Sequence, residues 1–161
     1  PYVRLAQREG YRARAAYKLK EIDETLGLIR PGDCVVDLGS TPGAWSQYIR
    51  RRLSPQGAAV GELHGHILAL DLLPMEAVEG VHFIQGDFRE PAVLAELEQA
   101  LIDRGIQAVD VVVSGTPMDL GRIIAVDQPL IRASYVLREI GSPTLAEVLS
   151  PYIAEWVGDL G

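Results

Sequence analysis

The chain has 161 residues, of which 48% are apolar and 23% are charged, and its formal net charge is −7. This balance is typical of a soluble globular protein, so we predict a single domain over residues 1–161 and exclude a disordered chain, a collagen and a coiled coil. The single cysteine and the lack of an apolar run of ~18 residues exclude an internal disulfide and predict a cytoplasmic protein that does not bind a membrane.

The charge is divided unevenly along the chain. Residues 1–52 hold 10 Lys and Arg against 6 Asp and Glu, a balance of +4, whereas residues 53–161 hold 5 against 16, a balance of −11. A basic N-terminal face on an acidic body could bind a polyanion locally. Because a solvated helix face is the more common explanation of such a charge run, charge alone does not predict a nucleic-acid-binding protein.

The predicted elements alternate between helix and strand. Residues 1–10 have helical character but no start signal, so we expect the chain to be cut from a longer protein. Apolar residues at helical spacing predict helices over residues 11–26, 44–52, 92–103, 130–140 and 145–157. Short apolar runs rich in β-branched residues predict strands over residues 34–38, 67–70, 81–85 and 109–113.

Alternation of this kind predicts an α/β fold, with a mostly parallel sheet, right-handed crossovers and helices on both faces. In open sheets of this class, ligands bind beyond the carboxyl ends of the strands. The residues that follow the predicted strands are therefore the first candidates for a functional site.

Three successive strand ends carry residues suited to binding a nucleoside. Gly39 and Gly43 flank a Gly/Pro turn, where glycine lets a ligand approach the backbone and the next helix offers free N–H groups. Asp71 follows the second strand and could accept hydrogen bonds from two ribose hydroxyls. Asp87 and Phe88 follow the third strand, where the carboxylate could accept from the adenine amine and the ring could contact the base.

Each feature also has a plainer explanation: a tight turn, a capping acid, or a loop acid beside a core ring. Because all three occur at successive strand ends, we favour a site for a nucleoside whose tail is not a phosphate, which indicates S-adenosylmethionine. The turn lacks the Gly-x-Gly-x-x-Gly of dinucleotide-binding proteins, which argues against a nicotinamide-dependent oxidoreductase. His64, His66 and His82 are too scattered to predict a metal site.

Four sequence motifs, in this order, strongly resemble those of the FtsJ/RrmJ family of ribosomal RNA 2′-O-methyltransferases. They are YRARAAYKL, VDLG followed by PGAWSQY, DLLPM, and QGDFR. The similarity is close over residues 1–113 and weak after residue 127. The resemblance implies the Rossmann-like class I fold of methyltransferases that use S-adenosylmethionine. It also implies methylation of a uridine ribose in the ribosomal RNA of the large ribosomal subunit, and we expect a monomer.

The resemblance implies roles for individual residues. Lys18 matches the first lysine of the family's Lys-Asp-Lys-Glu catalytic set, and Arg12 and Arg14 would hold RNA phosphates. The cofactor would be bound by residues at the three strand ends: Gly39, Gly43, Trp45, Asp71, Asp87 and Phe88.

The chain departs from the family pattern after the fourth predicted strand. The family has Ser-Asp-Met-Ala-Pro-Asn there, whereas residues 114–119 are Ser-Gly-Thr-Pro-Met-Asp, so Gly115 occupies the position of the catalytic aspartate. No lysine follows Lys20, so the second catalytic lysine is absent. We therefore expect a truncated or altered C-terminal part. An alternative function stays open: a catalytically impaired module of the same fold that binds the cofactor or RNA.

Overall fold

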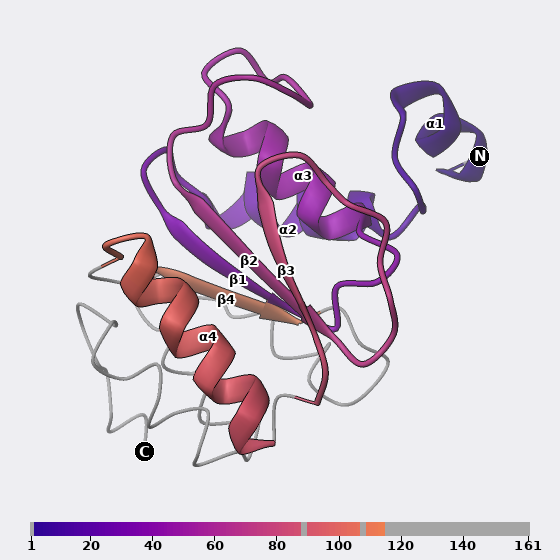
Figure 1. The fold of residues 1–161 in the computed structure, drawn as a ribbon. Helices are drawn as coiled ribbons and strands as arrows, with labels where there is room; N and C mark the ends of the chain where they lie inside the picture. The colour runs from indigo at the N-terminus through magenta and orange to yellow at the C-terminus, as the bar shows by residue number, and fades with distance from the viewer. Residues whose placement is uncertain (1, 88–89, 107–108, 115–161) are drawn as a thin grey trace, which may run out of the picture.

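The computed structural model describes residues 2–87, 90–106 and 109–114 (Figure 1). Phe88, Gly115 and the helices predicted over residues 130–140 and 145–157 lie outside this part of the chain. The elements in chain order are α1 (Tyr2–Glu9), α2 (Ala16–Leu26), β1 (Cys34–Leu38), α3 (Ala44–Leu53), β2 (His66–Asp71), β3 (Val81–Gln85), α4 (Pro91–Asp103) and β4 (Val111–Ser114).

The strands form one parallel four-stranded sheet with the order β3-β2-β1-β4. Helix α3 connects β1 to β2, and α4 connects β3 to β4. Figure 1 shows α2 and α3 on one face of the sheet and α4 on the other. The predicted parallel α/β sheet with helices on both faces is thus confirmed, and the predicted domain extent stays a prediction.

The burial of β1, which lies inside the sheet, explains why this strand was visible in the sequence. All five residues of β1 are buried, because helices cover both faces of the sheet, and four of the five are apolar, the exception being Asp37. On the face covered by α2 and α3, Val35 packs in one cluster with Leu19, Trp45 and Ile49. This cluster fixes α3, and therefore the turn before it, against the end of β1.

The first residue of β1 is bound by the segment before β4. The Cys34 N–H donates to Asp110 Oδ2 at 2.8 Å, and the Asp110 N–H donates to the Cys34 carbonyl at 2.9 Å. Burial raises the pKa of the Cys34 thiol to about 12, and the nearby carboxylates of Asp110 and Asp33 act in the same direction. Strand β4 begins after Asp110, later than the predicted residue 109, because this side chain takes one hydrogen bond of the ladder.

Helix α2 begins at Ala16, whereas the apolar spacing predicted a helix from residue 11. The backbone before it is used in other contacts: the Tyr11 N–H donates to the Ala6 carbonyl at 2.8 Å, and the Arg12 N–H donates to Gln47 Oε1 at 2.8 Å. Residues 10–15 therefore form a non-helical connection that lies against α3.

Within the described ranges, none of the helices is both long and apolar enough to cross a membrane.

Candidate functional site

The predicted site residues lie at the carboxyl ends of β1, β2 and β3. Leu38 pairs with Leu70, and Asp71 pairs with Gln85, so the three strands end side by side. The Gly39 N–H donates to the Leu70 carbonyl at 2.8 Å, which attaches the turn after β1 to the end of β2. The N–H of Gly86, the residue before Asp87, donates to the Asp71 carbonyl at 2.8 Å. The two turns therefore flank Asp71.

The half-buried carboxylate of Asp71 organises the loops around it. Its Oδ2 accepts from the Thr41 N–H at 2.8 Å, and its Oδ1 accepts from the Leu73 N–H at 2.9 Å. A carboxylate oxygen can accept more than one hydrogen bond, so both oxygens retain capacity for hydroxyl donors. Asp71 can thus hold the two loops and still accept from a vicinal diol.

Gly43, which precedes α3, has a φ of 112°, a conformation that favours glycine. A Cβ at this position would lie 2.8 Å from Arg12 Nη1 and 3.2 Å from Met75 Sδ. The chain's own arginine therefore occupies the space on this side of the glycine. The first N–H groups of α3 have no acceptor within the helix, and its N-cap residue, Gly43, has no side chain that could cap them.

Trp45 lies in the core beside the turn. Its indole is 6% exposed, and its Nε1–H donates to the Ala15 carbonyl at 2.7 Å. Because the ring is used in packing, the backbone N–H in the first turn of α3 is the group of Trp45 suited to a ligand. The indole instead links helix α3 to the connection that precedes α2.

Two buried acceptors at the end of β1 have no partner among the described residues. Asp37 is fully buried, its Oδ2 accepts from the Ser46 hydroxyl at 2.8 Å, and its Oδ1 is unpaired, as is the Ser40 Oγ. Burial raises the pKa of Asp37 to about 7, and the charge of Asp71 adds to the rise. Unpaired buried polar atoms are rare, and they fit a donor supplied by a ligand or water.

The ammonium and hydroxyl donors of S-adenosylmethionine are compatible with this set of acceptors. Asp71 offers oxygens to a ribose, and Asp37 and Ser40 offer buried acceptors one strand away. The sequence reasoning did not single out Asp37 as a site residue. The available signal was an aspartate within an otherwise apolar strand, the run CVVDL.

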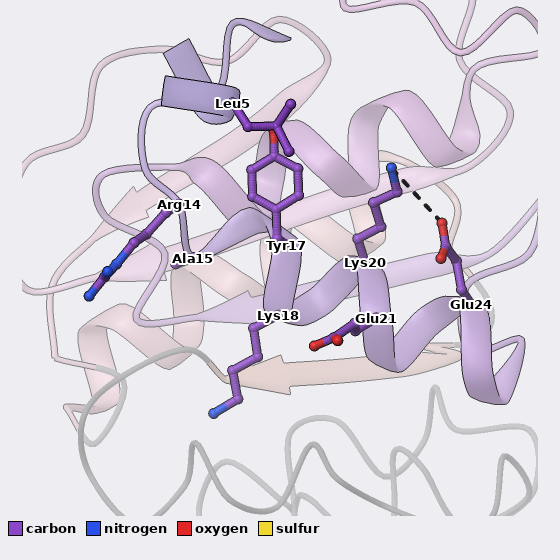
Figure 2. Close-up of a pocket in the computed structure, with 8 residues that line it drawn as sticks. All are labelled: Leu5, Arg14, Ala15, Tyr17, Lys18, Lys20, Glu21 and Glu24. Carbon is purple, nitrogen blue, oxygen red and sulfur yellow. Dashed lines mark ion pairs between the residues drawn. The ribbon is translucent and has the colours of Figure 1, made fainter. Parts of the chain in front are cut away.

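Lys18 and Arg14 line an open pocket of about 500 Å³ between α1 and α2 (Figure 2). Both side chains are exposed, and Leu5 and Tyr17 supply apolar lining. Figure 2 shows Lys18 extending away from Tyr17 and from Lys20. The structure thus places Lys18, the predicted catalytic residue, and Arg14, a predicted RNA-binding residue, on one exposed surface.

Tyr17 joins α1 to α2 at this pocket. Its hydroxyl donates to Glu9 Oε1 at 2.7 Å, and its ring meets the ring of Tyr11 edge-on at a centroid distance of 5.6 Å. Arg51, which lies on α3, places its guanidinium carbon 4.2 Å from the centroid of the Tyr11 ring. Partial burial and the acceptor Glu9 raise the pKa of Tyr17 to about 12, so its hydroxyl stays a donor near neutral pH.

Arg12 lies in the connection before α2, and its guanidinium contacts the turn at Gly43. Its Nη1 donates to the carbonyl of Pro42 at 2.9 Å and to that of Glu76 at 2.6 Å, and its Nη2 donates to the Ala77 carbonyl at 2.7 Å. The hydrogen bonds of the guanidinium described by the structure are thus to the chain's own backbone. The RNA contact suggested for Arg12 stays a prediction.

Asp87 is half-buried after β3, and its carbonyl accepts from the Glu90 N–H at 2.9 Å. Its predicted contact with adenine stays a prediction, as does that of Phe88. His64 contacts Glu62 and His82 accepts from Arg104, each at 2.9 Å. Across residues 2–87, 90–106 and 109–114, no three His, Cys, Asp or Glu side chains gather closely enough to hold a metal ion.

The chain is similar to known methyltransferases. The family model described as FtsJ-like methyltransferase matches residues 11–137. The chain is 72% identical over 128 residues to the ribosomal RNA large subunit methyltransferase E of Polaromonas sp. strain JS666, covering 79% of this chain and 52% of that protein. It is 68% identical over 126 residues to the same-named protein of Acidovorax sp. strain JS42, covering 78% of this chain and 56% of that protein.

The chain spans about half the length of these curated relatives. A solved structure is also similar, that of a Plasmodium falciparum chain named as a ribosomal RNA methyltransferase. The TM-score is 0.57 at 24% identity, with 89% of this chain and 72% of that chain covered. At this identity the likeness concerns the fold.

Proposed function

Because the chain belongs to the FtsJ-like methyltransferase family, we propose that it binds S-adenosylmethionine and methylates a uridine ribose 2′-hydroxyl of large-subunit ribosomal RNA. The observation that carries the proposal is the arrangement at the strand ends, where Asp71 fixes the loops after β1 and β2 and still has oxygens for a diol. The printed names of the curated relatives support ribosomal RNA of the large subunit as the substrate.

In this proposal, the turn after β1 and the end of β2 bind the cofactor. Asp71 would accept hydrogen bonds from the ribose hydroxyls of the cofactor, and the backbone of Gly39 and Gly43 would lie against the cofactor. The first N–H groups of α3 would bind the carboxylate of the cofactor. Asp87 and Phe88 would contact the adenine. S-adenosylmethionine, when bound, supplies a methyl group that its sulfonium activates.

Lys18 is the residue we propose for activating the nucleophile. A ribose 2′-hydroxyl is a weak nucleophile near neutral pH, so a neighbouring group must remove or polarise its proton. Lys18 is exposed on the pocket surface, where a nucleotide can approach it, and Arg14 on the same surface would pair with a phosphate. Positioning of the hydroxyl would supply much of the remaining acceleration.

Calorimetric titration with S-adenosylmethionine tests the cofactor part of the proposal. We expect micromolar binding by the wild-type chain, equivalent to about −8 kcal/mol. Asp71→Ala removes a charged acceptor, so its Kd should rise by at least about tenfold, since hydrogen bonds to charged groups contribute about 1.5–3 kcal/mol each.

Asp103→Ala is the matched control, since it removes an exposed aspartate at the end of α4. Thermal unfolding of each variant without ligand separates lost binding from lost folding. A folded wild-type chain that does not bind S-adenosylmethionine would refute the cofactor assignment.

The sequence also supports a second candidate, a catalytically impaired module that keeps binding. Gly115 occupies the position of the family's catalytic aspartate, and no lysine follows Lys20. Groups that act together in catalysis lose most of their effect when one is removed. A methyl-transfer assay with labelled cofactor and large-subunit RNA distinguishes the two candidates, with a full-length relative as the positive control. Binding without transfer would favour the module.

A further inference from the structure

We propose that Arg12 is a positioning residue. It lies in the segment before α2, the helix that carries Lys18, and it holds in place two loops that would bind the cofactor: the loop after β1 and the loop between β2 and β3. The inference rests on the proposed function for the identity of the ligand. It assigns to Arg12 a role toward the chain's own backbone, distinct from an RNA contact.

The guanidinium of Arg12 bridges two loops far apart in the sequence. It donates to the Pro42 carbonyl in the turn after β1, and to the carbonyls of Glu76 and Ala77 in the loop between β2 and β3. These three bonds lie between 2.6 and 2.9 Å. The side chain thus joins the loop that carries Gly43 to the loop that follows Asp71, in addition to the hydrogen bonds of Thr41 with Asp71, Leu73 and Pro74.

Gly43 shows that the fit between the arginine and the turn is tight. The Cβ that another residue would place here lies 2.8 Å from Arg12 Nη1 and 3.4 Å from the buried Val78. The turn and the guanidinium therefore share one packing arrangement, and a change in either one changes the position of the other.

The backbone of the same segment is fixed to α3. The Arg12 N–H donates to Gln47 Oε1 at 2.8 Å, and Gln47 Nε2 donates to the Gly10 carbonyl at 3.1 Å. Trp45 Nε1 donates to the Ala15 carbonyl at 2.7 Å. Residues 10–15 are therefore bound at both ends to α3, so Arg12 cannot move independently of the start of α2, which carries Lys18.

The acceptors explain why the residue is an arginine. All three are carbonyl oxygens, so the bonds depend on the directions of the donors as well as on the charge. Arginine presents planar N–H groups in a fixed geometry, whereas the lysine ammonium is a compact charge on a flexible stem. A lysine at position 12 would keep the charge and lose the simultaneous contact with both loops.

Hydrogen exchange and calorimetry together test the proposal. In Arg12→Gln, the amides of Thr41 and Leu73, which donate to Asp71 from the two loops, should exchange at least about tenfold faster, while those of α4 should be unchanged. The Kd for S-adenosylmethionine should rise by about tenfold or more, because the loops must be ordered on binding. Arg12→Lys should behave like Arg12→Gln in both measurements.

Arg8→Gln is the control, because it removes one positive charge from an exposed site on α1 in the same N-terminal segment. Unchanged loop exchange in folded Arg12→Gln, or wild-type affinity in Arg12→Lys, would overturn the proposal. If Arg12→Gln does not fold, Arg12→Lys decides. If the wild-type chain does not bind S-adenosylmethionine, the proposed function fails, and the exchange data alone still decide the role of Arg12.

Discussion

At the scale of single residues, Gly43 is subject to two constraints, a positive φ and the Arg12 guanidinium, which lies 2.8 Å from the position of a Cβ. Gly43→Ala should destabilise the fold by about 1–2 kcal/mol for the left-handed backbone. A further cost of about 1–3 kcal/mol is expected because the new methyl group displaces Arg12 from its carbonyl partners. Urea unfolding measures the sum.

Gly57→Ala separates these two contributions. Gly57 has a φ of 66°, and nothing lies within 4 Å of the position of a Cβ, so it should show the backbone cost alone. In a chain that already carries Arg12→Ala, Gly43→Ala should also cost less, because the contact is gone. Equal costs at the two glycines would contradict the packing argument.

Asp37 predicts a pH dependence of stability. Burial raises its pKa from 3.8 to about 7, so between these values the native state binds a proton that the unfolded state has released. The contribution of this group to stability is therefore complete below about pH 4 and is lost as the pH rises to about 7.

Asp37→Asn removes this titration and keeps an acceptor for the Ser46 hydroxyl. The stability of the variant relative to wild type should rise across the same pH range, by an amount on the order of 4 kcal/mol. Urea unfolding of both chains from about pH 4 to about pH 8 measures the difference. A constant difference would show that Asp37 does not titrate there.

Arg12 and Arg14 show what the sequence could not distinguish. Both occur in one basic motif and both were predicted to hold RNA phosphates, yet Arg14 is exposed whereas Arg12 donates to three backbone carbonyls. The carbonyls lie in loops 30 to 65 residues further along the chain. A local pattern carries no information on such distant acceptors.

At the scale of elements, one buried carboxylate joins α2 to α3. Asp23 is 2% exposed, and its Oδ2 accepts from the Tyr48 hydroxyl at 2.5 Å and from Arg52 Nε at 2.8 Å. Its Oδ1 accepts from the Ile29 N–H at 2.7 Å. The carboxylate thus fixes both the angle between the helices and the path of the chain from α2 into β1.

Asp23→Ala should therefore destabilise the fold by about 3–5 kcal/mol, because it leaves the hydroxyl of Tyr48 and the Ile29 N–H without their partner. The neighbouring Glu24 is the control: its side chain is 64% exposed and its ion pair with Lys20 measures 4.0 Å. Glu24→Ala should change stability by less than about 0.5 kcal/mol in urea unfolding. Similar effects of the two variants would contradict the network.

The fully buried strand β1 was predictable from the sequence, whereas the start of α2 was not. A strand buried on both faces has to be apolar, so its residues identify it without tertiary information. The start of α2 depends on the acceptors available to residues 11 and 12, and these lie on α1 and α3. Apolar spacing continues through such a connection even though the helix does not.

At the scale of the whole molecule, the proposed RNA binding should depend on a few cations, because residues 1–52 carry a balance of +4 and the rest of the chain carries −11. If Arg14 pairs with one phosphate of a single strand, Arg14→Gln should make the negative slope of log K against log salt shallower by about 0.7. Arg30→Gln should leave the slope unchanged, because Arg30 precedes the amino end of β1, whereas the candidate site lies at the carboxyl ends of the strands. Filter binding of a single-stranded RNA at several salt concentrations measures both.

The position of the candidate site was predictable because a parallel sheet brings its carboxyl ends to one edge. Asp71 and the turn at Gly43 were found in this way, and the structure joins them through Thr41. The unpaired acceptor of Asp37 was not predictable, because the sequence does not show which polar atoms in a core lack a partner.

The position of Cys34 also has a practical consequence. It is the chain's single cysteine, and it is 3% exposed with a pKa of about 12, so almost no thiolate is available to alkylating reagents near neutral pH. A cysteine added at the surface can therefore be labelled without removal of the native one. A maleimide dye attached at an exposed loop residue such as Gln56 would label one defined position, and the fluorescence would report from that position alone.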